Sequence, residues 1–354
     1  MSSHATLPQE LYRSILENLV GDRRSLLRVL LASKALQAEG ERILYRAVID
    51  LGYKPQQFDD STTLQQDLNT KFFASIMAPG REHVSLYVRA FSIRGGVFTR
   101  RNALFRSLLC VALKSMKNLK FLSFGSDRPS AEFLEGCTFQ LEVLRWECTC
   151  IYDELALRRF LPLQRSLTHF FTENWMLFDK NPILVPTLKV LGGRCTVIRQ
   201  FLPGNHIECL LWQADVIVYP IGHFAPEFNR LQALSLRGRY AGEVLEVVKG
   251  HLASLQILEF GEPPYAAELR WLPQVPRLEH LILSSWNKPT LEVGTHEDTV
   301  QHLFASNKIL QYVDIHVERT AYERWQRGSI KPLEKLIDSL DVRRAWNADE
   351  TWMA

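Results

Sequence analysis

Apolar residues recur at helical spacing through the first fifty residues of the chain. Pro8 stands where a helix can begin, because its fixed φ and missing N–H are both tolerated in a first helical turn. Asp22 and Ser33 are placed to cap a second and a third helix. The three apolar stripes are Leu11, Ile15, Leu16 and Leu19; Leu26, Leu27, Leu30 and Leu31; and Leu36, Ile43 and Leu44. So small a unit cannot bury all of these side chains internally, which indicates that part of this surface meets a partner.

From about residue 86 a second pattern repeats along the chain. Its unit is an apolar residue, two variable positions, an apolar residue, one variable position and another apolar residue. It recurs mostly at intervals of about 20 to 29 residues, which is typical of leucine-rich repeats. The units are Val88, Phe91, Ile93; Leu119, Leu122, Phe124; Leu141, Leu144, Trp146; Leu167, Phe170, Thr172; Leu188, Leu191, Gly193; Ile207, Leu210, Trp212; Leu231, Leu234, Leu236; Leu255, Leu258, Phe260; Leu278, Leu281, Leu283; and Leu310, Val313, Ile315.

Each unit predicts one short strand whose inward residues need neighbouring units to bury them. The expected fold is therefore α/β: a small N-terminal three-helix segment, then an irregular leucine-rich-repeat-like solenoid with a parallel sheet on its concave face. Helices are expected at residues 102–116, 242–252 and 297–306. The repeats lack the usual Asn after the third apolar position, and Thr172 and Gly193 stand where apolar residues are expected, so the solenoid should be irregular. Ordinary buried strands of another α/β fold are the alternative interpretation.

These patterns divide the chain into four expected segments. Residues 1–50 form the helical segment, in front of a connection at 51–85 with one amphipathic helix over residues 64–76. The solenoid spans 86–328, and residues 329–354 form a C-terminal capping helix, opened by Pro332, and a tail. Ala47, Ile49 and Leu51 alternate as in a strand just before the connection.

Composition and charge exclude several classes of protein. The hydrophobic content of 46% is too high for a disordered chain, and the net charge of +3 gives no indication of nucleic-acid or membrane binding. The polar start lacks the features of a secretory signal, and no stretch has the roughly 18 apolar residues of a membrane span. We therefore expect an intracellular protein, cytoplasmic or nuclear.

Motifs for catalysis and metal binding are missing from the sequence. The 6 Cys residues show no C-x-x-C spacing, and Cys148 and Cys150 make at most half a metal site, so a packing role is expected for them. No nucleophile elbow, phosphate-binding loop, dinucleotide fingerprint or H-E-x-x-H motif occurs. We expect no catalytic residues, no metal and no cofactor. An enzyme whose site forms only in three dimensions is the alternative.

The variable positions of the repeats point away from the core and should form a recognition surface for an unknown protein substrate. The expected contacts are Arg145, Phe171, Arg194, Leu211, Arg237, Glu259, Ile282 and Asp314, with Glu147, His169, Glu173, Gln213, His280 and His316 beside them. Charged and large apolar residues together suit binding to a protein surface.

The N-terminal segment also resembles a known motif. Leu7-Pro8-Gln9-Glu10-Leu11, with Ile15-Leu16, Leu19, Leu26-Leu27, Ala32-Ser33-Lys34 and Ile43-Leu44-Tyr45 after it, resembles the F-box over about residues 5 to 49. Ala32 and Leu36 depart from the residues common at their positions in the family. With the repeats, the chain is similar to fungal-type F-box proteins with C-terminal leucine-rich-repeat-like regions.

This resemblance implies a role as the substrate-recognition subunit of a cullin-RING (SCF-type) ubiquitin ligase. The F-box would dock an Skp-type adaptor, and through it a cullin, while the repeats hold the substrate. The candidate adaptor contacts are then Leu7, Pro8, Ile15, Leu16, Leu19, Leu26, Leu27 and Leu30, some of which must pack among the helices. The alternative is a repeat scaffold for protein interactions whose helical segment only caps the solenoid.

Overall fold

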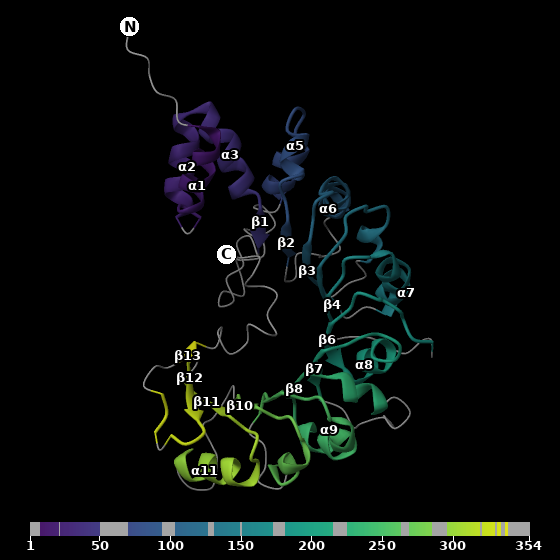
Figure 1. Ribbon diagram of the computed structural model, residues 1–354. Helices are drawn as coiled ribbons and strands as arrows, with labels where there is room; N and C mark the ends of the chain where they lie inside the picture. The colour runs from purple at the N-terminus through teal and green to yellow at the C-terminus, as the bar shows by residue number, and fades with distance from the viewer. Residues whose placement is uncertain are drawn as a thin grey trace. The chain divides into compact units, whose positions relative to one another are not determined.

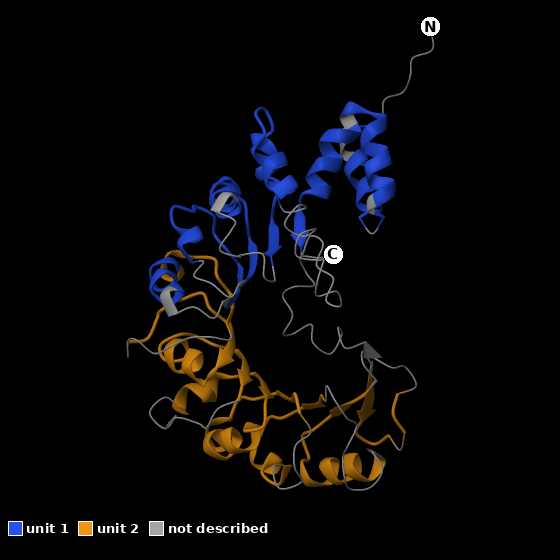
Figure 2. Ribbon diagram, turned by 180° about the vertical axis from the view of Figure 1, so that it is seen from behind, with its two compact units in different colours: residues 1–160, 352–354 blue, residues 161–351 orange. Residues whose placement is uncertain are grey.

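The computed structural model describes residues 8–20, 22–49, 70–93, 103–126, 131–148, 151–172, 181–214, 225–262, 269–284, 296–318, 321–329, 331–333 and 337–338. The chain divides into two compact units, which Figure 2 distinguishes by colour. Unit 1 comprises residues 1–160 and 352–354, and unit 2 comprises residues 161–351. This division falls inside the expected solenoid.

Three helices open unit 1: α1 (Gln9–Glu17), α2 (Arg23–Ala32) and α3 (Lys34–Leu44). Pro8 immediately precedes α1, and the Asp22 carboxylate caps α2 by accepting the backbone N–H groups of Arg24 and Ser25. The same hydrogen bonds, with one from the Ser25 hydroxyl, hold the pKa of Asp22 below its ordinary value. These caps confirm the predicted helix starts at Pro8 and Asp22.

Leu16, Leu26 and Leu30 form the buried core of the three helices. A Cβ at Gly40 would overlap the side chain of Leu30, so the glycine allows α2 and α3 to pack closely. Leu11 and Ile15 of the first stripe and Leu27 and Leu31 of the second remain exposed, because a core of this size holds few side chains.

A parallel sheet follows in unit 1, with strands in chain order (Figure 1): β1 (Ala47–Ile49), β2 (Ala90–Ile93), β3 (Phe121–Ser126) and β4 (Val143–Cys148). Helical segments join the strands: residues 70–77, α5 (Glu82–Ser85), α6 (Ala103–Ser115), η1 (Ala131–Leu134) and α7 (Ile151–Phe160). Since β1 pairs in parallel with β2, the sheet begins ahead of the predicted start at residue 86. Val48 is the buried residue of β1, and Ala47 and Ile49 are half-buried.

Aromatic side chains fix the helix at residues 70–77 to the first strands. Phe72 stacks against Tyr45 and Phe91, and Phe73 packs against Phe91 and Phe105. The Tyr45 hydroxyl lies 3.2 Å from the Ser75 hydroxyl. The predicted amphipathic helix is confirmed over this range, and its expected start at residue 64 lies outside the described residues.

Unit 2 continues the alternation of strands and helical segments. Its parallel strands are β5 (His169–Thr172), β6 (Val190–Arg194), β7 (Cys209–Gln213), β8 (Ala233–Arg237), β9 (Ile257–Phe260), β10 (His280–Leu283) and β11 (Tyr312–Glu318). Between them lie η2 (Leu161–Leu163), α8 (Cys195–Phe201), η3 (Ala225–Arg230), α9 (Ala241–Val248), η4 (Lys249–His251), η5 (Leu272–Gln274) and α11 (His296–Ser306). The helices of unit 2 lie along one side of its strands (Figure 1).

The predicted repeat is confirmed in both units. Each predicted repeat contains a strand, and the central apolar residues pair in register from β2 to β4 and from β5 to β11, as Leu210 does with Leu234 and Leu234 with Leu258. These residues are fully buried. The fold is therefore α/β with a helical N-terminal segment and leucine-rich-repeat-like parallel strands. The helices expected at 102–116, 242–252 and 297–306 are confirmed as α6, α9 with η4, and α11, whereas α7 and α8 were not predicted.

Two buried asparagines satisfy backbone groups between repeats, in place of the Asn that the repeats lack. Asn307 accepts the N–H groups of Ile309 and Leu310 and donates to the Leu272 carbonyl of the preceding repeat, at 3.0, 3.2 and 3.1 Å. Asn205 accepts the Val185 N–H and donates to the Ile183 and Phe201 carbonyls. Both asparagines stand two or three positions before the first apolar residue of a repeat. Each side-chain amide therefore satisfies backbone groups just before the chain enters a strand.

The C-terminal end differs from the prediction. In place of a helix opened by Pro332, two antiparallel strands follow the repeats: β12 (Ala321–Gln326), which pairs with β11, and β13 (Ile337–Asp338), which pairs with β12. The predicted helix is wrong at 337–338, and the rest of it from 334 onward lies outside the described residues. Tyr322 and Trp325 of β12 are buried, so a sheet edge with large aromatic residues covers the last repeat.

Candidate functional site

The sheet of unit 2 has a face that alternates with the core positions and lies away from the helices, and we call it the open face. Its middle row crosses successive strands in direct register: Phe171, Gly192, Leu211, Ser235, Glu259, Ile282 and Asp314. Two residues further along the strands a second row joins Arg194, Gln213, Arg237 and, after β9, Gly261. The register follows from the repeat spacing, since a period of two fixes which side chains share a face.

The predicted recognition residues fall into two groups. Phe171, Arg194, Leu211 and Arg237 are half-buried on the open face, and Arg145 occupies the equivalent position on β4 of unit 1. Glu259, Ile282 and Asp314 are buried, so their prediction as surface contacts is corrected. Of the flanking set, Glu147, His169, Gln213, His280 and His316 are half-buried, and Glu173 lies outside the described residues.

The antiparallel strand β12 accounts for the burial of Ile282 and Asp314. It places Tyr322 against Ile282 in one small hydrophobic cluster, with Ile257 beside them. It also sets Arg324 directly opposite Asp314. The repeat pattern contains no information on β12, because this strand follows neither the spacing nor the direction of the others.

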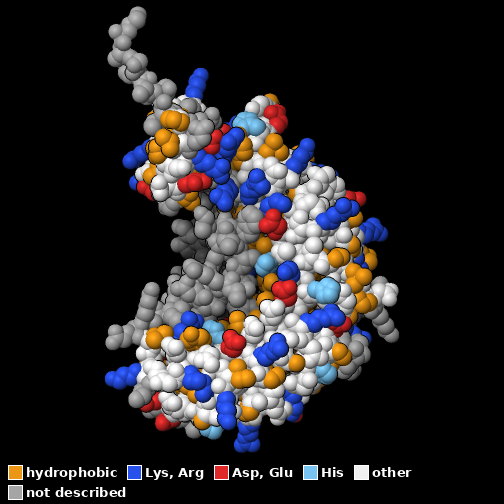
Figure 3. Space-filling view, viewed as in Figure 1, with side chains coloured by type: hydrophobic (Ala, Val, Ile, Leu, Met, Phe, Trp, Pro, Cys, Tyr) orange, Lys and Arg blue, Asp and Glu red, His pale blue; other side chains and the backbone are white. Residues whose placement is uncertain are grey.

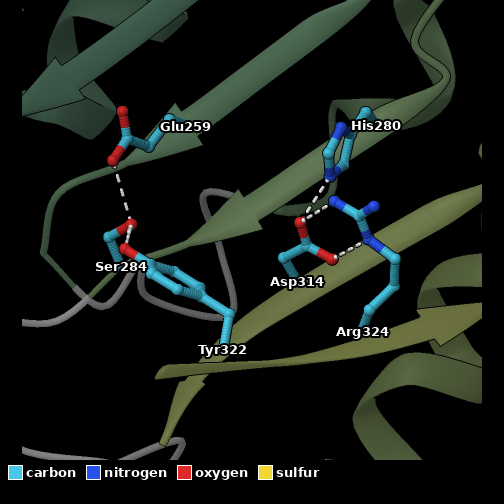
Figure 4. A network of polar contacts seen from close by, with 6 residues as sticks. All are labelled: Glu259, His280, Ser284, Asp314, Tyr322 and Arg324. Carbon is cyan, nitrogen blue, oxygen red and sulfur yellow. Dashed lines mark hydrogen bonds and ion pairs between the residues drawn. The ribbon is translucent and has the colours of Figure 1, made fainter. Parts of the chain in front are cut away.

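Asp314 forms the centre of a charged cluster that joins β10, β11 and β12 (Figure 4). Arg324 donates two hydrogen bonds to the Asp314 carboxylate, at 2.8 and 2.7 Å, and His280 Nε2 lies 2.8 Å from Oδ2. Burial of Asp314 opposes its ionisation, but the hydrogen bonds and charges of Arg324 and His280 outweigh it, so the pKa of Asp314 lies below its ordinary value of 3.8. Asp314 is therefore an ionised, internally compensated carboxylate.

A second polar chain lies beside this cluster (Figure 4). The Ser284 hydroxyl donates to Glu259 Oε1 at 2.9 Å and lies 2.6 Å from the Tyr322 hydroxyl. All three side chains are buried. Ser284 thus contacts Glu259 and Tyr322 while His280 contacts Asp314, so these groups do not form a Ser-His-Asp relay. The arrangement fastens β12 to β9 and β10.

The strands β5 to β8 present a different surface, which we call the Phe171/Arg194 surface: Phe171, Leu211, Arg194, Gln213 and Arg237. A Cβ at Gly192 would overlap the Phe171 ring, so the missing side chain lets the ring lie across β6 toward Leu211. In the same way, the Arg237 side chain lies over Gly261. No local pattern marks these glycines as supports, because their function depends on the neighbouring strand.

The predicted adaptor contacts also divide by exposure. Pro8, Ile15 and Leu27 are exposed and Leu19 is half-buried, whereas Leu16, Leu26 and Leu30 form the helical core. Leu7 lies outside the described residues. The structure adds Leu11, Val20 and Leu31, which are also exposed, and Leu31 retains 90% of its accessible surface. Hydrophobic side chains are visible at the surface of the helical segment in Figure 3.

The described residues give no indication of a reactive thiol or of a metal site. Burial raises the pKa of Cys137 to about 12 and that of Cys209 to about 11, so both remain protonated at neutral pH. Within the described ranges, no group of three His, Cys, Asp or Glu residues could hold a metal ion. The Cys148 side chain and Cys150 are outside those ranges. None of the helices described is long and apolar enough to cross a membrane.

Comparison with known proteins gives similarity in fold only. No family model matches the chain, and no curated protein matches it. Among solved structures, an internalin (InlF) from Listeria monocytogenes matches over 70% of this chain and 68% of its own, with 11% identity and a TM-score of 0.31. At this level of similarity the match carries no argument about function. The description of the fold as leucine-rich-repeat-like rests on the strands of this chain and their register.

Proposed function

We propose that this chain is a non-catalytic scaffold that binds another protein on the Phe171/Arg194 surface. The observation that supports the proposal is the combination of a flat aromatic ring, an aliphatic side chain and two guanidinium groups on neighbouring strands. Aromatic residues and Arg contribute most of the binding energy in protein interfaces. Rigid parallel strands hold these groups in place, which lowers the entropy lost on binding.

The surface is tested by placing a charge in its apolar part. Leu211→Glu should abolish capture of the binding partner while leaving the unfolding midpoint nearly unchanged, because Leu211 is only half-buried. Val247→Glu is the matched control, since Val247 is an exposed aliphatic residue on α9 of the same unit. Affinity purification with quantitative mass spectrometry compares the two variants with the wild type. Equal capture of every partner by all three proteins would contradict the proposal.

The finer proposal is that the helical segment docks an Skp-type adaptor, which would make the chain a receptor subunit of a cullin-RING ubiquitin ligase. It rests on the F-box resemblance and on the exposure of Ile15 and Leu27, each at 48%, beside a filled core. Exposed aliphatic side chains in a helical segment are typical of a docking surface. The adaptor would carry the cullin, and the substrate would occupy the Phe171/Arg194 surface.

Binding of purified adaptor tests this finer proposal directly. The wild type should bind it, and Ile15→Glu with Leu27→Glu should abolish binding without unfolding the helices, as checked by circular dichroism. Leu163→Glu is the control, because Leu163 is exposed at 67% on η2 of the other unit. If the wild type does not bind the adaptor, the ligase role is wrong and the scaffold role alone stands.

A further inference from the structure

Charge on the open face of unit 2 is distributed unevenly. Among its described side chains from β5 to β11, the carboxylates are Glu259 and Asp314, and both are buried. Asp314 is compensated by Arg324 and His280, and Glu259 accepts the Ser284 hydroxyl. These two described carboxylates are therefore covered by the protein and are not available to a partner.

The two arginines of the Phe171/Arg194 surface, unlike Asp314, have no close partner of opposite charge at hydrogen-bond distance among the described residues. Arg194 has no acidic partner among the described residues, and Arg237 has only Glu259, whose Oε2 lies 3.9 Å from Nη2, beyond hydrogen-bond distance. The Nε atom of each is buried without a hydrogen-bond partner in the described part of the chain. The Nε atoms are thus covered by the protein, whereas the Arg237 side chain as a whole remains 35% exposed.

Register sets the spacing of these charges. Arg194, Gln213 and Arg237 are direct partners on β6, β7 and β8, so the two arginine Cα atoms lie two strand spacings, about 10 Å, apart. Because Arg237 lies over Gly261 toward β9, its guanidinium is displaced away from Arg194. Two anionic groups about 10 to 13 Å apart would fit this row. In an extended segment this separation corresponds to about three or four residues.

We propose that the row formed by Arg194, Gln213 and Arg237 recognises an extended acidic segment of the partner protein, with two anionic side chains three or four residues apart. The inference rests on the proposed scaffold function and specifies its partner. Guanidinium groups bind carboxylates and phosphates in paired hydrogen bonds, and Gln213 offers an amide to the backbone between them. The neighbouring Phe171 and Leu211 bind the apolar residues of the same segment. A nucleic acid is disfavoured because the net charge of the chain is only +3.

A peptide array probed with the full chain tests the inference. Short synthetic peptides with randomised flanks carry two Glu, two phosphoserine or two Gln residues at every spacing from adjacent to about seven apart. Enrichment of Glu or phosphoserine pairs at spacings of three and four is expected, and the stronger of the two series identifies the anion. Binding should weaken at least about tenfold in Arg194→Gln with Arg237→Gln, and also in high salt. Arg230→Gln is the matched control, since Arg230 is exposed on η3 and pairs with Glu227.

Three results would overturn the inference: equal enrichment of Gln and anionic pairs, unchanged binding by the double arginine variant, or stronger capture of single-stranded RNA than of acidic peptides. Leu211→Glu separates this inference from the scaffold proposal. If Leu211→Glu releases the cellular partner and the double arginine variant keeps it, the surface is right and its preference for acidic segments is wrong. If both variants keep the partner, the surface itself is wrong.

Discussion

A single carboxylate, Asp314, links three strands at the end of unit 2. Replacing it with Asn removes the charge but keeps the shape, and leaves Arg324 and His280 facing a neutral amide. Breaking a buried ion pair by removing one partner costs about 3 to 5 kcal/mol. Since Arg324 is partly exposed, we expect Asp314→Asn to lower the free energy of unfolding by about 3 kcal/mol in urea titrations. Arg230→Gln, which breaks the pair of the exposed Arg230 with the half-buried Glu227, should cost less, about 1 kcal/mol.

The contribution of Asp314 should also depend on pH. Its pKa is lower in the folded than in the unfolded chain, so its stabilisation is fully present above the ordinary value of 3.8 and is lost as the pH falls through the folded pKa. The difference in unfolding free energy between wild type and Asp314→Asn should therefore shrink as the pH falls below about 4. A difference that is as large at about pH 3 as at about pH 5 would refute this account of the cluster.

Truncation to Ala should change the stability of the protein very differently at two neighbouring residues of β8. Leu234 is a fully buried core residue, and Leu234→Ala should cost about 2 to 5 kcal/mol because a cavity remains between two repeats. Ser235 is equally buried on the open face, where its hydroxyl has no partner among the described residues. Ser235→Ala should therefore be neutral or slightly stabilising. Similar losses in denaturant midpoint for the two variants would contradict the register.

At the scale of elements, the buried asparagines determine how a helix leads into the next strand. Asn307→Ala leaves two backbone N–H groups and the Leu272 carbonyl without the amide, and unsatisfied buried groups cost about 1 to 3 kcal/mol each. We expect a loss of about 3 kcal/mol in unfolding free energy and faster hydrogen exchange at Leu310. Lys308→Ala, next in sequence and exposed, is the control and should change neither quantity. Unaltered exchange at Leu310 would show that water replaces the amide.

The strands of the repeats were predictable from the sequence, whereas the helix α7 and the C-terminal strands were not. The apolar spacing around Leu210 and Leu234 predicted their strands and core orientation, because a buried strand needs that period whatever its neighbours are. The helix α7 was missed, since its buried polar residues Asp153 and Glu154 disguise the apolar stripe. Asp153 accepts the Trp146 indole N–H and the Ala131 backbone N–H, which are contacts that no local pattern contains.

At the scale of the whole molecule, the helical segment is built into unit 1. Tyr45 stacks on Phe72, Arg81 pairs with Glu41 at 3.2 Å, and β1 pairs with β2. Removing residues 1–50 should therefore lower hydrogen-exchange protection in β2, while β8 of unit 2 keeps its protection because repeats interact mainly with their neighbours. Mass-spectrometric exchange on the full and truncated chains measures both strands. Unchanged protection in β2 would instead support the predicted boundary at residue 50.

The candidate surfaces were predictable in part. Sequence alternation identified Phe171, Arg194, Leu211 and Arg237 as outward residues, and they are half-buried on the open face. It identified Glu259, Ile282 and Asp314 by the same rule, yet these are buried. Alternation decides which face of the sheet a side chain occupies, but it contains no information on what covers that face.

The sequence by itself determined the repeat, the parallel strand order, the core rows and the helical N-terminal segment, because these depend on local periodicity and on burying apolar residues of consecutive units. Only the tertiary structure decided which outward residues are accessible, which leucines of the helical segment fill its core, and how the last repeat is covered. Those outcomes depend on contacts between residues distant in sequence, such as Tyr322 with Ser284 and Arg324 with Asp314, and on glycines at positions 192 and 261 whose effect lies in the neighbouring strand.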